Sequence, residues 1–362
     1  MSTTPVALVT AALRAPQETV AYTLRQWEEL IHQARRANLL SRIAQSLGEL
    51  RLLPRVPPAP RAHLDAALVM ARAQTEAVQR EVAFLRKALA KADVDLVLLK
   101  GAAYLIADLP AARGRVFSDI DILVPVAKLD EVEAALMLHG WATTHHDAYD
   151  QRYYRKWMHE LPPLRHIVRT TVVDVHHAIL PPTARLKPDS AKLLAASRPI
   201  GGEARLRVLG PADMVLHSAT HLFHNEDLSQ GLRDLADLDS LLRHFGSEPG
   251  FWEELPGRAA ELDLARPLYY GLRYASHFLG TPVPAETRRR ADAGRPPRMA
   301  GRLMDALYDR ALRPVAPNDA DSLTPLSRRA LYVRAHWLRM PPLLLAWHLS
   351  VKALRREQDP AR

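Results

Sequence analysis

Apolar residues recur with helical spacing over the first part of the chain. They lie three or four positions apart within residues 16–49 and again within 62–91. A proline-rich connection at 54–60 separates the two stretches. We therefore expect residues 1–91 to form an N-terminal helical region.

Short apolar runs that favour strands dominate the middle of the chain. Single strands are predicted at 95–99, 119–124, 141–144 and 171–176, and a hairpin at 153–158 and 164–168. Helices are predicted between them at 102–109 and 128–139, the second ending at Gly140.

Beyond Pro181 the pattern turns helical. Helices are predicted at 212–226, 232–245, 253–279, 298–312 and 327–356. The expected organisation is an N-terminal helical region at 1–91, a small mixed-sheet core at 92–182 and a helical C-terminal domain at 183–362. This arrangement belongs to the α+β class.

Composition limits what the chain can do. With 362 residues it can form two domains, or one core with helical extensions. It has no cysteine, which excludes disulfides, thiolate metal sites and a cysteine nucleophile, and favours a cytoplasmic setting. We expect no secretory signal and no transmembrane segment, because residues 1–20 lack a basic region before an apolar core and no apolar run is long enough.

Nearly all of the formal net charge of +9 falls in residues 285–362. Two interpretations stay open. This basic C-terminal region contacts a polyanion such as RNA or an anionic membrane surface, or it is an arginine-rich face in contact with solvent.

Two carboxylates inside an apolar run need an explanation. Asp119 and Asp121 are separated by Ile120, and strand residues two positions apart point to the same face. Adjacent carboxylates repel unless a divalent cation or a guanidinium neutralises them. The pair is a candidate metal site, and the alternative is a strand edge with solvated aspartates.

A candidate anion site precedes the aspartates. The first predicted strand ends at Lys100-Gly101, and the helix that follows would present backbone N–H groups at its N-terminus. Arg115 lies in the loop that leads to the aspartates. A glycine after a strand is also common in α/β folds, so this signal is weak alone.

Another carboxylate lies in the strand at 171–176. Asp174 is expected on the face opposite Val173 and Val175, and His176 shares its face. The alternative is a partly exposed edge strand with alternating polar residues.

The helix at 212–226 carries His217, His221 and His224 on one face. Three histidines at this spacing could bind zinc, but no further zinc-ligand signature accompanies them. The favoured interpretation is that they line a cleft or pack against aromatic residues.

Three motifs together resemble the nucleotidyltransferase superfamily that includes DNA polymerase β. They are Leu99-Lys100-Gly101-Ala102, the run 115–124 around the two aspartates, and Val173-Asp174-Val175-His176. The chain looks most like a largely uncharacterised bacterial family with a Leu-Lys-Gly start and an Asp-Val-His third strand. The resemblance covers residues 95–245.

The resemblance implies a nucleotidyltransferase core and a Mg²⁺-dependent enzyme. It would move a nucleoside monophosphate from an NTP, such as ATP, to a hydroxyl acceptor and release pyrophosphate. The acceptor would be a small molecule, a peptide or an RNA end. Asp119, Asp121 and Asp174 would be catalytic and would hold two Mg²⁺ ions, with Mn²⁺ as a substitute.

The resemblance also implies a set of substrate-binding residues. They are Lys100, Gly101, Ala102, Arg115, Ser118, His176 and His221. The superfamily has Gly-Ser or Gly-Gly where this chain has Lys100-Gly101-Ala102, so Lys100 or Arg115 would supply the phosphate contact.

Two other functions stay open. The same site would serve a kinase-like phosphotransferase, which releases a nucleoside diphosphate instead of pyrophosphate. The fold would also serve a non-catalytic module that binds nucleotide or RNA.

Overall fold

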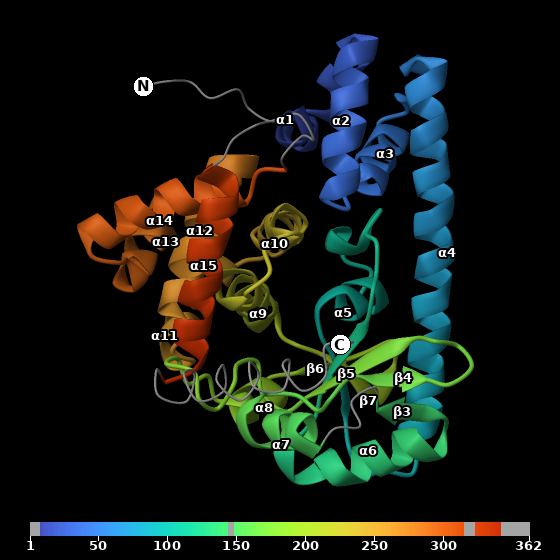
Figure 1. Ribbon diagram of the computed structural model, residues 1–362, viewed down its shortest axis with the longest axis vertical. Helices are drawn as coiled ribbons and strands as arrows, with labels where there is room; N and C mark the ends of the chain where they lie inside the picture. Colours follow the sequence, from blue (N-terminus) through green and yellow to red (C-terminus); the bar gives the residue numbers. More distant parts are fainter. Residues whose placement is uncertain (1–7, 144–147, 315–322, 342–362) are drawn as a thin grey trace, which may run out of the picture.

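A computed structural model describes residues 8–143, 148–314 and 323–341 of the chain. The fold is α+β, as the sequence predicts: a seven-stranded mixed sheet lies at one end of the molecule and helices extend from it (Figure 1). Part of the expected basic C-terminal region, residues 342–362, lies outside the described residues.

The strand order in the sheet is β3-β4-β5-β2-β1-β7-β6. The strands are β1 (Leu96–Leu98), β2 (Ile120–Leu123), β3 (Trp141–Thr143), β4 (Leu164–His166), β5 (Val172–His176), β6 (Arg198–Ile200) and β7 (Glu203–Val208). The neighbours β2 and β5 run parallel, as do β1 and β7, whereas β1 and β2 are antiparallel. All residues of β1 and β2 are buried, so these strands form the centre of the sheet.

The N-terminal helices form one side of the molecule in Figure 1. They are α1 (Leu8–Arg14), α2 (Leu24–Arg36), α3 (Leu40–Glu49) and α4 (Pro58–Leu89). Thr23 caps α2 through a reciprocal capping box with Gln26, which fixes where that helix begins. At 32 residues, α4 is about 48 Å long, and its buried Glu81 binds Arg169 and so ties the helix to the sheet.

Further helices follow the first strands and continue through the C-terminal region. They are α5 (Lys100–Ile106), α6 (Leu129–Leu138), α7 (Ala148–Trp157), α8 (Ser190–Ala195), α9 (Pro211–His224), α10 (Gly231–Phe245), α11 (Phe251–Glu261), α12 (Ala265–Leu279), α13 (Ala285–Ala291), α14 (Arg298–Ala311) and α15 (Leu323–Arg339). None of the helices in the described part of the chain has the length and apolar character needed to cross a membrane.

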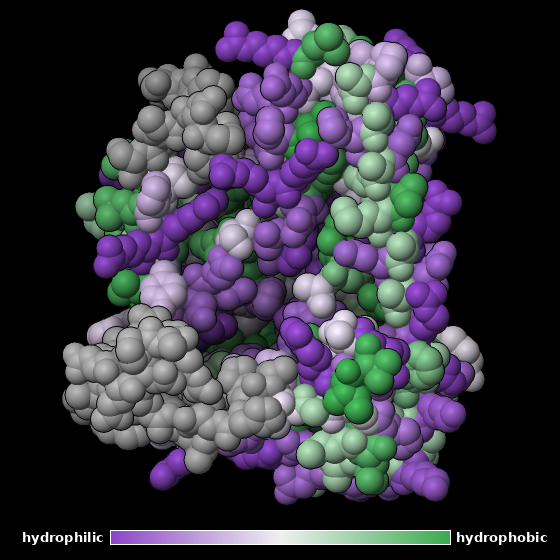
Figure 2. Space-filling view, turned by 45° about the vertical axis from the view of Figure 1, so that its right-hand side comes forward, coloured by the Kyte–Doolittle hydropathy of each residue, from purple (hydrophilic) through white to green (hydrophobic). Residues whose placement is uncertain are grey.

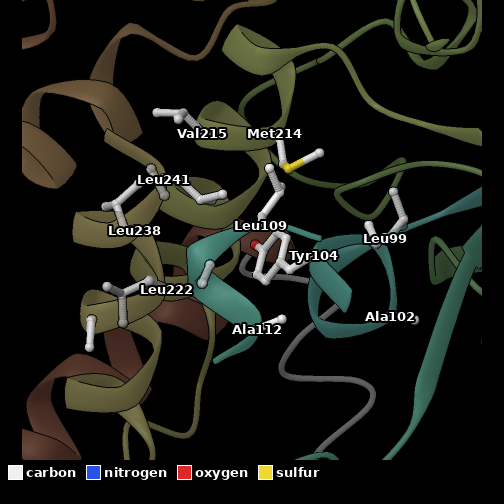
Figure 3. Packing of buried hydrophobic residues seen from close by; sticks show 14 of the residues in the cluster. Leu99, Ala102, Tyr104, Leu109, Ala112, Met214, Val215, Leu222, Leu238 and Leu241 are labelled. Carbon is white, nitrogen blue, oxygen red and sulfur yellow. The ribbon is translucent and has the colours of Figure 1, made fainter. Parts of the chain in front are cut away.

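An apolar core joins the sheet region to the C-terminal helices. Figure 3 shows Tyr104 of α5 and Leu109 close to Met214 of α9 and to Leu238 and Leu241 of α10. All five side chains are buried. This packing places one end of α9 and of α10 over the start of α5, where the site described below lies.

Several secondary-structure expectations are wrong. Residues 153–158 do not form a hairpin strand, because 148–157 form the helix α7 and β4 pairs instead with β3 and β5. The tyrosines in this stretch favour a strand, but its many charged residues suit a helix with one solvent-facing side.

The chain is also not purely helical beyond Pro181, because β6 and β7 extend the sheet. Gly201 and Gly202 form the turn between these two strands, both at positive φ (+66° and +74°). Such a pair of glycines is a strong hairpin signal in a sequence. The helical stretch expected at 16–49 contains two separate α-helices, α2 and α3. The helix expected at 253–279 is divided between α11 and α12.

A buried ion network connects three distant segments. The Asp237 carboxylate of α10 accepts hydrogen bonds from Arg42 of α3 and from Arg115, whose Nε lies 2.9 Å from Oδ2. Burial raises the pKa of Asp237, but the two guanidinium groups outweigh burial and hold this pKa below its usual value. The network therefore fixes α3 and α10 to the loop before β2.

Replacing Asp237 by Ala leaves two buried guanidinium groups without their shared carboxylate. We expect the free energy of unfolding to fall by about 3–5 kcal/mol, measured by urea denaturation at neutral pH. The control is Glu76→Ala at the exposed pair with Arg80, which should cost about 1 kcal/mol or less. Equal losses in both variants would contradict a special role for the buried network.

Candidate active site

Strands β2 and β5 place two aspartates side by side. Asp121 and Asp174 are direct partners in the parallel register, so their side chains lie on the same face of the sheet. Ile120 and Ile122 of β2 are buried on the opposite face. Asp119 lies just before β2 and accepts a hydrogen bond from the Ser118 hydroxyl at 2.8 Å.

Asp121 is the most strongly engaged of these carboxylates. Its Oδ1 lies 2.7 Å from Lys100 Nζ and 2.9 Å from His176 Nε2, and the side chain is 5% exposed. Burial alone would raise the pKa of Asp121, but Lys100 and His176 hold it well below its usual value. Burial likewise lowers the pKa of Lys100, and Asp121 outweighs burial and raises it. Both groups are therefore charged.

Lys100 reaches Asp121 from an uncommon backbone conformation. Its φ is +45°, although it is not a glycine, at the point where β1 ends and α5 begins. Such a conformation costs of order 1–3 kcal/mol and persists only where surrounding contacts favour it. The ion pair between Lys100 and Asp121 is one such contact.

Asp174 lies in a different environment from Asp121. Its Oδ1 is buried and has no hydrogen-bond partner. Burial, together with the carboxylates of Asp121 and Glu160, raises the pKa of Asp174 to about 7. This carboxylate lacks a positive partner of its own.

Glu160 completes the group, although no sequence motif indicated it. It precedes β4, forms a bridge with β5 and lies 3.2 Å from Nδ1 of His176. Burial lowers the pKa of His176, but Glu160 and Asp121 outweigh burial and raise it. His176 is thus held between two carboxylates and lies behind Asp121.

Arg115 and Gly101 pack against each other at the edge of the site. The Arg115 guanidinium is 9% exposed and pairs with Asp237. A Cβ atom at position 101 would overlap its Nη1 and Cζ atoms, so only glycine leaves room for this side chain. The structure accordingly gives Gly101 a clear role in placing Arg115.

Lys100, Asp119, Asp121 and Arg115 border a cavity of about 200 Å³ that residues of α5, α9 and α10 also line. The described residues that line it include seven expected from the sequence, and these are Lys100, Gly101, Arg115, Ser118, Asp119, Asp121 and His221. Residues that the sequence did not indicate also line it, among them Ser218, Asn225, Gln230, Arg233 and Asp234. Figure 2 shows a hollow on one face that hydrophilic residues surround.

The cavity carries more negative than positive charge. Its described lining has three cationic side chains, Lys100, Arg115 and Arg233, and five aspartates, Asp119, Asp121, Asp227, Asp234 and Asp237. Each cationic side chain is already paired with an aspartate, and Arg233 lies 2.8 Å from Asp234. The lining would therefore repel a phosphate-bearing ligand unless cations bind together with it.

Other expected residues, Asp174 and His176 of β5 among them, do not line the cavity. Ala102 is buried in the apolar core, so its side chain offers nothing to a ligand in the cavity. Burial lowers the pKa of His217 and of His224 to about 3, so both are neutral residues within the packed helices. Only His221 of these three histidines lines the cavity.

The residues present fit a divalent cation. Asp174 offers a buried oxygen with no partner, Asp121 is its register partner on β2, and Asp119 directly precedes β2. Carboxylate oxygens are the ligands that Mg²⁺ and Mn²⁺ prefer. A cation here would supply the positive charge that Asp174 lacks.

A comparison with protein families covers all of these residues. A family model described as "Uncharacterised nucleotidyltransferase" matches residues 23–280, which is more than half of the chain. No curated protein and no solved structure matches the chain.

The raised pKa of Asp174 predicts that its ionised carboxylate lowers the free energy of unfolding. Because its folded pKa of about 7 lies above the unfolded value of about 3.9, the cost grows as pH rises from about 4 to about 7 and is constant above that. Asp174→Asn should therefore be more stable than the parent chain at pH 8 in EDTA, with the difference shrinking toward pH 5. Urea denaturation measures this, and a difference that does not change with pH would contradict it.

Proposed function

The chain belongs to the uncharacterised nucleotidyltransferase family, and we propose that it transfers a nucleoside monophosphate from an NTP to a hydroxyl-bearing acceptor. The match confirms the family expected from the motifs and supports nucleotidyl transfer in general. The observation that carries the finer proposal is the register of Asp121 with Asp174, beside a cavity that Asp119 and Lys100 also line.

The proposal assigns Asp119, Asp121 and Asp174 to holding Mg²⁺, with Mn²⁺ as a substitute. When bound, such ions neutralise phosphate charge and make the acceptor hydroxyl easier to deprotonate. The unpartnered oxygen of Asp174 and the excess of aspartates in the cavity both support this assignment.

Asp174 is also placed to accept a proton. A carboxylate beside the acceptor hydroxyl is a suitable general base once a bound cation has lowered the pKa of that hydroxyl. In the proposed reaction the acceptor oxygen bonds to the α-phosphorus, the bond from that phosphorus to the β-phosphate oxygen breaks, and pyrophosphate leaves. The hydroxyl proton passes to Asp174.

Cationic side chains of the cavity would orient the phosphates. Lys100 lies at the start of α5, and Arg233 lies across the cavity on α10. Both are paired with aspartates, and the proposal is that incoming phosphate oxygens share these cations. Arg115 stays with Asp237 and supports the cavity wall.

Nucleotide binding should depend on divalent cations. Because the described lining of the cavity has two more aspartates than cationic side chains, we expect a non-hydrolysable ATP analogue to bind at least about tenfold more tightly with Mg²⁺ than in EDTA. Isothermal titration calorimetry measures the two affinities. Equal affinities would contradict the proposed role of the acidic lining.

Asp121→Asn should reduce nucleotidyl transfer by about 100-fold or more, because it removes a charged ligand next to the reacting phosphate. The assay follows label from α-labelled NTPs into acceptors of a host extract, together with pyrophosphate release. Asp305→Asn, at an exposed pair far along the chain, is the matched control and should keep its activity.

The products decide between the two enzymatic functions. Release of nucleoside diphosphate in place of pyrophosphate would identify a kinase-like phosphotransferase. Full transfer activity in Asp121→Asn would contradict both.

A further inference from the structure

Three metal-ligating residues lie together beside β5. One donor atom each from His159, Glu160 and His176 falls within 4.8 Å of the others. Among the described residues, these three form the one group of at least three histidine or acidic residues whose donor atoms lie that close together. The three carboxylates of the proposed magnesium site do not form such a group.

Backbone hydrogen bonds hold this group in place. The amide of His177 donates to the carbonyl of His159 at 2.9 Å, and the amide of Leu161 donates to the carbonyl of Val175 at 2.9 Å. The segment 159–161 is therefore fixed along β5. The rings of His159 and His176 lie 5.3 Å apart between their centroids.

The hydrogen bonds of His176 leave one nitrogen facing a carboxylate. Because Asp121 is a carboxylate acceptor, Nε2 of His176 must carry the hydrogen between them. In a neutral ring Nδ1 then has a lone pair, and this atom lies 3.2 Å from Oε2 of Glu160. In that state the two lone pairs would repel each other, so this contact requires either a proton on Nδ1 or a metal ion bound to it.

His159 provides a second, independent observation. Its Nδ1 is buried and has no hydrogen-bond partner. Buried polar atoms are normally paired, so such an atom calls for an explanation. A metal ion bound by Nδ1 of both histidines and by Glu160 would satisfy all three residues.

We propose that His159, Glu160 and His176 bind a zinc ion, at a site distinct from the aspartates of the proposed active site. Two imidazoles and one carboxylate form a known zinc ligand set with bonds of about 2.0–2.2 Å, which puts donor atoms roughly 3.3 Å apart. The Nδ1 of His176 and Oε2 of Glu160 already lie 3.2 Å apart.

The zinc ion would link this segment to the active site. In this site His176 would bind zinc through Nδ1 and donate its Nε2–H to Asp121. A carboxylate in this position orients a zinc-bound histidine. Lys100 and Arg339 are paired with Asp121 and Glu226. The metal thus holds His176 in the position from which it contacts Asp121. This inference does not rest on the proposed function.

The test measures metal binding by the full chain without any activity assay. The protein is stripped with a chelator, dialysed and titrated with Zn²⁺ alone by calorimetry, and Co²⁺ is added separately to record its visible absorption. We expect one Zn²⁺ per chain and a tetrahedral Co²⁺ spectrum. His159→Gln and Glu160→Gln should each weaken Zn²⁺ binding by about 100-fold or more.

Controls separate this site from the others. His177→Gln, a histidine next to the group whose Nε2 bonds to the Met158 carbonyl, should bind Zn²⁺ like the parent chain. Asp174→Asn should do the same, even if it abolishes nucleotidyl transfer. Circular dichroism verifies that each variant is folded.

Three results would overturn the proposal. They are no stoichiometric Zn²⁺ binding by the parent chain, unchanged binding in both His159→Gln and Glu160→Gln, and loss of binding in Asp174→Asn. The first would leave His176 as an imidazolium between two carboxylates, and the last would place the ion at the aspartates.

Discussion

The negative charge of Asp121 and Asp174 on adjacent parallel strands is the constraint on which the site depends. Two carboxylates in register on a buried sheet must be neutralised, and the fold does this for only one of them. Lys100 and His176 neutralise Asp121, whereas an oxygen of Asp174 keeps no partner. The sheet thus holds one neutralised carboxylate, which lines the cavity, and next to it on β5 one carboxylate that is not neutralised.

The helical regions serve this arrangement by fixing the loop that precedes β2. The Asp237 carboxylate of α10 pairs with Arg42 of α3 and with Arg115 of the loop. Helices from the N-terminal and C-terminal regions therefore meet at one carboxylate. Gly101 gives Arg115 the space to reach it. The cavity wall is therefore a product of ion pairing as well as of the apolar packing seen in Figure 3.

Local patterns in the sequence, with the family resemblance that they carry, predicted the α+β class, the central strands and seven of the described residues that line the cavity. The alternation in β2 and β5 placed Asp121 and Asp174 on strand faces, but their register depends on long-range pairing that no local pattern contains. Glu160 lies outside any regular strand and carries no motif signal. The β6–β7 hairpin did have a signal, the glycines at 201 and 202, which helical expectations for this region obscured.

The central claim is that the aspartates of β2 and β5 bind divalent cations together with a nucleotide. Crystals grown with Mn²⁺ and an ATP analogue that cannot be cleaved at the α-phosphate test it directly, because anomalous scattering locates each manganese ion. The account predicts an anomalous peak within bonding distance of both Asp121 and Asp174, about 2.1–2.3 Å from their oxygens, with the analogue's phosphates in the adjoining cavity. Bound nucleotide with no manganese at these two carboxylates would contradict it.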